Sequence, residues 1–102
     1  MNATEALTRR LSLIPGVVSG PSRVGNPAHL AWFTGQREFA HLHSPEILDI
    51  RLPKSVQDEL RTDPRATFRQ HRSAWVEFRI ESKTDIDDAL RLLRIAHEAA
   101  GA

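Results

Sequence analysis

The chain has 102 residues, with 14 Lys and Arg, 13 Asp and Glu, five His and no Cys, and its net charge is +1. This length suits one domain, which we expect to span residues 1–102. The nearly balanced charge disfavours nucleic acid as a partner. The lack of Cys excludes disulfides, thiol catalysis and thiolate metal sites. No apolar run is long enough to span a membrane and no signal peptide is visible, so we expect a cytoplasmic protein.

The first half of the chain predicts one helix followed by a run of strands. Leu7, Leu11 and Ile14 recur at helical spacing, with Asn2 or Thr4 as the cap, and residues 15–16 end the helix. A short strand is then expected from residue 17 to the Gly-Pro break at 20–21, and further strands at 29–33, 37–43 and 47–52. The tight connection at 34–36 predicts a hairpin between the second and third of these strands.

The second half predicts a short helix, two strands and a long final helix. Pro53 suits a first helical turn, with Val56 and Leu60 on its apolar side. Strands follow at 66–70 and 75–80, and Thr84 is the expected cap of a helix that ends near Gly101. Strands flanked by terminal helices indicate an α+β fold: a single, mainly antiparallel sheet with the N- and C-terminal helices packed on one face. The exposed edges of such a sheet could pair in a homodimer.

Strict alternation along each strand separates an apolar face from a polar one. In the strand at 37–43 it assigns Glu38, Ala40 and Leu42 to the apolar face, and Arg37, Phe39, His41 and His43 to the other. With the equivalent positions of the later strands, the second face gathers histidines, arginines, two carboxylates and aromatic rings. Such a face can be the solvated side of an antiparallel sheet, or it can bind a ligand and transfer protons near neutral pH.

A His with a carboxylate partner is a plausible general acid and base, and no Ser or Cys nucleophile accompanies it. The candidate catalytic residues are therefore His41, His43 and Asp49. The candidate ligand-binding residues are Arg37, Arg51, His71 and Trp75. The histidines with Asp49 could alternatively hold Zn, Fe or Mn. Because no second clustered pair of ligands exists, we expect neither a metal nor another cofactor.

The stretches at 37–43 (REFAHLH), 48–53 (LDIRLP), 75–78 (WVEF) and 89–94 (ALRLLR), together with His71, resemble a small domain of many bacterial proteins called the luciferase domain. The same domain forms the C-terminal part of fungal luciferases. The resemblance covers roughly residues 11–99, and its most specific part is the 37–43 core. The order of elements also loosely resembles the double-wing domain of MmcQ/YjbR-like proteins, for which DNA binding has been suggested.

The resemblance implies a chemistry for the polar face. Fungal luciferases oxidise a hydroxylated α-pyrone with molecular oxygen, so His41 or His43 would deprotonate a hydroxylated ring, and Arg37 or Arg51 would stabilise the anion. The leading hypothesis is therefore a small-molecule site, in which a hydroxylated aromatic ligand undergoes oxidative chemistry without a cofactor. The alternative is a non-catalytic module that binds protein or nucleic acid with the same face. Whether the chain is an enzyme stays open at this point.

Overall fold

The sheet is antiparallel throughout. The computed structural model describes residues 2–69 and 73–102, and within them six strands pair in the order β1-β2-β3-β4-β6-β5. The strands are β1 (Val17–Pro21), β2 (Leu30–Thr34), β3 (Arg37–Ser44), β4 (Ile47–Arg51), β5 (Ala66–Phe68) and β6 (Trp75–Arg79). The edge strands are β1 and β5, so a homodimer through a strand edge remains a prediction.

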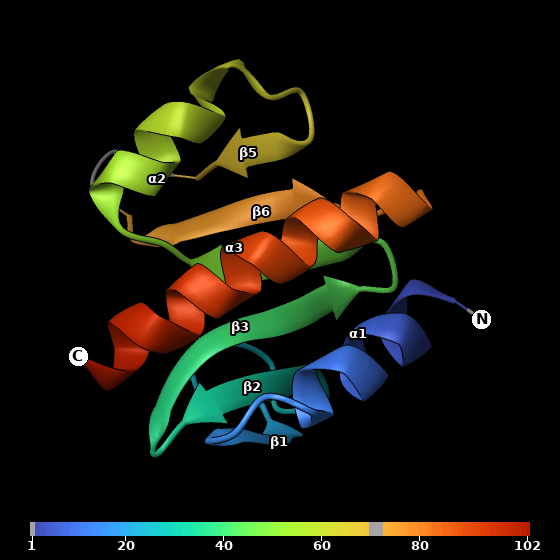
Figure 1. The fold of residues 1–102 in the computed structure, drawn as a ribbon, viewed down its shortest axis with the longest axis vertical. Helices are drawn as coiled ribbons and strands as arrows, with labels where there is room; N and C mark the ends of the chain where they lie inside the picture. Colours follow the sequence, from blue (N-terminus) through green and yellow to red (C-terminus); the bar gives the residue numbers. More distant parts are fainter. Residues whose placement is uncertain (1, 70–72) are drawn as a thin grey trace.

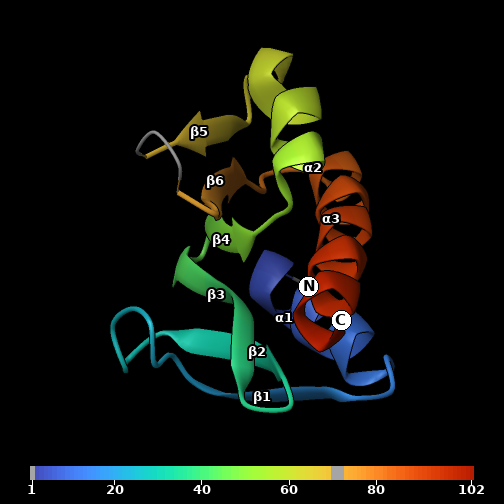
Figure 2. The ribbon, with the colours of Figure 1, turned by 90° about the vertical axis from the view of Figure 1, so that its left-hand side faces the viewer.

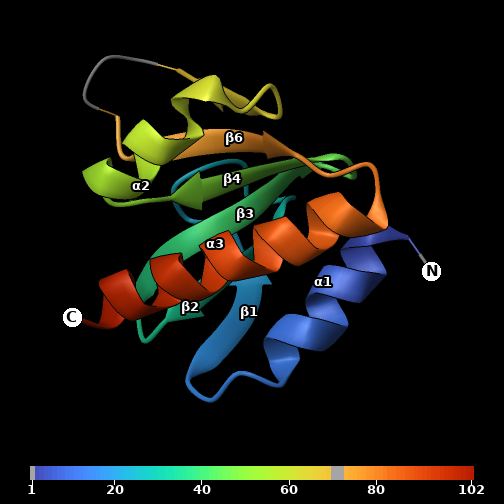
Figure 3. The ribbon, with the colours of Figure 1, turned by 45° about the horizontal axis from the view of Figure 1, so that its top comes forward.

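The helices lie on one side of this sheet (Figures 1 and 2). They are α1 (Ala3–Ser12), α2 (Lys54–Glu59) and α3 (Lys83–Gly101), with a short 3-10 helix, η1 (Leu60–Thr62), after α2. The last helix, α3, runs obliquely across the sheet with α1 beside it, as Figure 3 shows. The predicted α+β fold, with terminal helices on one face, is thus confirmed, while the double-wing topology remains a prediction.

The two long helices are capped by side chains that accept backbone hydrogen bonds. At α1, Asn2 Oδ1 accepts the N–H of Glu5 at 2.8 Å, as the sequence allows. At α3 the predicted cap, Thr84, is wrong. Ser82 has the extended backbone of a cap and accepts the N–H of Asp85, whose carboxylate in turn accepts the N–H of Ser82. This reciprocal pair satisfies two otherwise free donors, so the helix begins two residues earlier than predicted.

The hydrophobic core fills the space between the sheet and the helices. Leu7 and Leu11 of α1 and Leu92 and Leu93 of α3 are fully buried in it. The strands contribute Trp32, Phe39, Ala40, Leu42, Leu48, Ile50, Val76, Phe78 and other apolar residues. Trp32 is therefore a core residue and is unavailable for stacking on a ligand.

An irregularity in β3 changes which side chains share a face. Trp32 pairs with Ala40 and Phe33 pairs with Glu38, which leaves Phe39 without a partner in the ladder. This is the pattern of a β-bulge, which shifts the alternation by one residue. Phe39 and Ala40 therefore both join the core, and Glu38 lies on the face of His41. The predicted faces of Glu38 and Phe39 are wrong for this reason.

Replacing Leu93 with Ala tests the core. Leu93 is fully buried, so we expect the variant to lose about 2–5 kcal/mol of unfolding free energy through lost burial and the cavity that remains. The matched control is Leu13→Ala, because the Leu13 side chain is 76% exposed, and it should change stability by less than about 0.5 kcal/mol. Equilibrium urea unfolding measures both, and equal losses would contradict this packing.

Candidate functional site

His41 lies between two carboxylates on the sheet face away from the helices. Its Nδ1 is 2.9 Å from Glu38 Oε2, and its Nε2 is 2.8 Å from Asp49 Oδ2. All three side chains are buried, and Asp49 is fully so. A neutral imidazole has only one N–H to donate, so two carboxylate contacts require both nitrogens to be protonated. The geometry therefore holds His41 as an imidazolium.

The pKa values of these groups agree with this charge state. Burial lowers the pKa of His41, but the hydrogen bond and charge of Asp49, followed by those of Glu38, outweigh burial, and the pKa is raised above its usual value. For Glu38, burial acts in the opposite direction and raises the pKa. The hydrogen bonds donated by Arg23, Ser22, Val24 and His41 outweigh it and bring the pKa below the usual value. Both pKa shifts therefore favour the charged forms of His41 and Glu38.

The charged chain continues from Asp49 toward the sheet edge. Arg69 Nη2 donates to Asp49 Oδ2 at 2.8 Å and to Glu77 Oε1 at 3.0 Å. Successive charges therefore alternate in sign from Glu38 through His41, Asp49 and Arg69 to Glu77. We call these five residues the His41 network. Asp49 Oδ1 is buried and has no hydrogen-bond partner among the described residues.

The loop after β1 covers His41. Glu38 Oε1 accepts the N–H groups of Arg23 at 2.6 Å and Val24 at 3.2 Å, and Glu38 Oε2 accepts the hydroxyl of Ser22 at 2.7 Å. These bonds draw Gly25 so close that a Cβ there would lie 3.2 Å from His41 Nε2. Figure 2 shows this loop on the side of the sheet away from the helices. Only glycine allows so close an approach without displacing the imidazole.

The predicted site residues divide into groups. His41 and Asp49 are in direct contact, and the ring of Trp75 lies 5.1 Å from that of His41. His43 lies instead beside His29 of the loop, with 5.6 Å between the rings, at a second irregularity in the β3–β4 register. His71 lies outside the described residues, and its predicted role remains a prediction.

Arg37 and Arg51 belong to a different place, a cavity at one end of the sheet. β3 and β4 pair from Ser44 to Ala40, whereas Arg37 pairs with β2 and Arg51 with β6. The two strands therefore part just beyond the bulge at Phe39. A cavity of about 340 Å³ lies at this fork, beneath the C-terminal end of α3. We call it the fork cavity.

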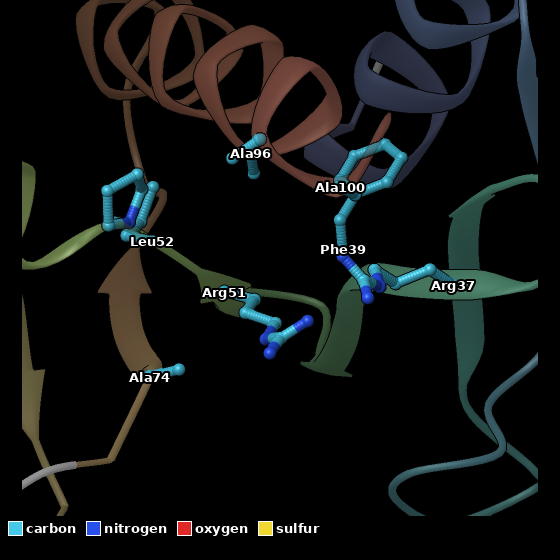
Figure 4. Close-up of a pocket in the computed structure, with 9 residues that line it drawn as sticks. Arg37, Phe39, Arg51, Leu52, Ala74, Ala96 and Ala100 are labelled. Atoms are coloured by element: carbon cyan, nitrogen blue, oxygen red, sulfur yellow. The ribbon is translucent and has the colours of Figure 1, made fainter. Parts of the chain in front are cut away.

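The fork cavity is cationic at its mouth and apolar inside. Figure 4 shows Arg37 and Arg51 extending into the same space from β3 and β4, with Ala96 and Ala100 of α3 above them. Both arginines are exposed, while the remaining lining is apolar. That lining consists of Phe39, Leu52, Pro53, Ala74, Ala96, Ala99 and Ala100. A cavity of this kind suits a small anion that carries an apolar group.

Sequence reasoning missed several residues of the site. Strict alternation places Glu38 on the apolar face, and the sequence pattern predicts no role for the loop residues Ser22 and Gly25. Arg69 belongs to the predicted polar face, but no role in the site is predicted for it. The spacing of Glu38 and His41, three residues apart, carries no signal for a strand, because only a bulge brings two such residues to one face.

Two properties of the described residues bear on other functions. No group of three or more His, Asp and Glu side chains within them has an arrangement that could hold a metal ion. Across the same ranges, 2–69 and 73–102, no helix has the length and apolar character needed to cross a membrane.

Comparison with known proteins identifies one family. The family model described as Luciferase domain matches residues 36–96, which include β3, β4, β6 and most of α3. The match thus covers His41 and Asp49 as well as Arg37 and Arg51. No curated protein and no solved structure gave a significant match. Because the family model covers more than half of the chain, the chain belongs to the Luciferase domain family.

Proposed function

We propose that the chain binds a small hydroxylated aromatic molecule, in its ionised form, in the fork cavity. The observation that carries this proposal is the pair of guanidinium groups, Arg37 and Arg51, at the mouth of a cavity whose lining is otherwise apolar. The anionic oxygen of the ligand would lie between the guanidinium groups, and its ring would lie against Phe39 and the alanines of α3.

The charges of Arg37 and Arg51 are available to a ligand. Other arginines of the chain are paired with carboxylates: Arg65 binds Asp63, Asp85 and Asp88, and Arg69 binds Asp49 and Glu77. Within the described part of the chain, neither Arg37 nor Arg51 forms an ion pair. Two like charges that face one space favour an anion there, because it relieves their mutual repulsion.

Two guanidinium groups would also favour ionisation of the ligand. A cation close to a hydroxyl lowers its pKa, so an acidic ring hydroxyl at this mouth would release its proton to solvent. The family resemblance supports an oxidative step on that ring anion. Molecular oxygen would add to an electron-rich ring carbon, and the resulting peroxide oxygen would take up a proton. The product is then the ligand plus one molecule of oxygen, and no other oxidant or reductant is needed.

The His41 network has a different place in this proposal. The general-base role predicted for His41 requires it to release one of two carboxylates, because both of its nitrogens already donate. We assign to the network instead the positioning of β4, whose Asp49 lies two residues before Arg51 and whose Arg51 pairs with Trp75. Catalytic roles for His41, His43 and Asp49 remain predictions.

Replacing both Arg37 and Arg51 with Gln should weaken ligand binding at least tenfold, because each lost charged hydrogen bond costs about 1.5–3 kcal/mol. The probe is a hydroxylated methyl-pyrone, whose hydroxyl ionises near neutral pH, and calorimetry measures its affinity. The methyl ether of the probe, which cannot ionise, should bind weakly to the wild type and equally weakly to the double variant.

The control substitution is Arg91→Gln, at an exposed position of α3 outside the cavity, and it should leave binding unchanged. If the double variant binds the pyrone as tightly as the wild type does, the site is wrong. Oxygen uptake in the presence of the pyrone tests the chemical step. Uptake above the rate without protein, lost in the double variant, supports it, whereas binding without uptake removes the oxidative part alone.

Replacing His41 with Gln should abolish the pH dependence of stability above about pH 6.5, the usual imidazole pKa. Because the pKa of His41 is raised on folding, its ion pairs stabilise the fold fully below that pH and are lost as the pH rises through the folded-state value. The wild-type free energy of unfolding should therefore fall as the pH rises from about 6.5 through the folded-state pKa of His41. At pH 6 the substitution should lower the free energy of unfolding by about 3–5 kcal/mol, since two buried carboxylates lose their cation.

Urea unfolding at several pH values measures this effect, and His43→Gln is the control, because exposed His43 should leave the slope unchanged. Imidazole-nitrogen NMR on the wild type gives a second, direct readout. Both nitrogens of His41 should remain protonated at neutral pH. A neutral His41 ring at pH 7, or a slope that disappears in the His43 variant, would show that the charge assignment is incorrect.

A further inference from the structure

The fork cavity begins where the inward-facing residues of α3 become small. Leu92 and Leu93 are fully buried and fill the space between helix and sheet. One turn later the inward residue is Ala96, and after a further turn it is Ala100, with Ala99 next to it. A leucine at these positions would extend into the volume that the cavity occupies. The step from leucine to alanine along one helix face therefore creates the cavity.

The lining is ordered by depth. Phe39, Leu52 and Ala96 are buried, at 0%, 3% and 1% exposure, so they form the closed end. Arg37 and Arg51 are exposed and lie at the mouth (Figure 4). A ligand with one charged and one apolar end can satisfy both regions only if its apolar end enters first. The charged group then stays at the mouth, where water still reaches it.

Retaining this space lowers the stability of the fold. The open space leaves apolar lining in contact with water, which larger side chains on α3 would cover. Larger apolar residues on α3 would recover part of that loss, so the alanines are unfavourable for packing alone. Positions that give up stability in this way are commonly ones that serve function.

We propose that Ala99 and Ala100, with Ala96 beneath them, set the length of the apolar group that the ligand carries beyond its ionised ring. The preferred ligand is then a ring anion with a short alkyl or aryl substituent that points under α3, rather than the bare ring. This inference rests on the proposed function, because it takes the anion to lie between Arg37 and Arg51. It adds a specificity determinant on a helix that carries none of the charged groups of the site.

The experiment compares two probes, a hydroxylated pyrone with a methyl group and its analogue with a butyl group at the same ring position. Calorimetry on the full chain measures both affinities. The wild type should bind the butyl compound at least tenfold more tightly, because each buried methylene adds roughly fourfold. In Ala99→Leu and in Ala100→Leu this preference should shrink to less than about threefold, while the methyl compound stays within about twofold of its wild-type affinity.

The control is Ala28→Leu, the same substitution at an exposed loop position outside the cavity, which should keep the full preference. Ala99 is itself exposed, so its variant should fold even if the change at half-buried Ala100 is less well tolerated. If both probes bind through Arg37 and Arg51 but the alanine variants keep the wild-type preference, this inference is overturned alone. If neither probe binds, or binding ignores both arginines, the proposed function fails with it.

Discussion

The β-bulge at Phe39 in β3 positions both the His41 network and the fork cavity. Without it, Glu38 would point into the core, and its carboxylate would have neither His41 nor the loop after β1 as a partner. With it, Phe39 enters the core beside Ala40, and the strand bends away from β4. A single insertion in one strand thus turns the Glu38 carboxylate toward His41 and lets β3 and β4 part at the fork cavity.

The His41 network and the fork cavity lie next to each other along β3 and β4, and they differ in how their charges are balanced. The His41 network is dense: its charges alternate in sign, and the burial of Glu38, His41 and Asp49 is tolerated because each of these charges has a partner of opposite sign. The fork cavity is the reverse: its lining carries two arginines and, among the described residues, no carboxylate to balance them. The charges of the His41 network are thus neutralised within it, whereas those of Arg37 and Arg51 face the fork cavity.

Local sequence patterns predicted most of the helices and strands correctly. Helical spacing located α1 and α3, and alternation correctly assigned Leu48, Ile50, Val76 and Phe78 to the core. Alternation failed in β3, since a bulge depends on how two strands pair and leaves no mark in either one. The contact of His41 with Asp49 could be anticipated, because the two residues lie on adjacent predicted strands. The place of Glu38, the loop over His41 and the separation of the arginines from the histidines could not, because they depend on the bulge and on how the strands pair.

The four hydrogen bonds that Glu38 accepts also govern how the sheet assembles. Its donors come from Ser22, Arg23 and Val24, which follow the edge strand β1, and from His41 near the sheet's centre. A buried carboxylate is unfavourable until those donors arrive. The edge strand of an antiparallel sheet would ordinarily fray before its centre does. Here the shared carboxylate makes β1 part of the same cooperative folding unit as β3 and β4, so that these strands gain and lose their structure together.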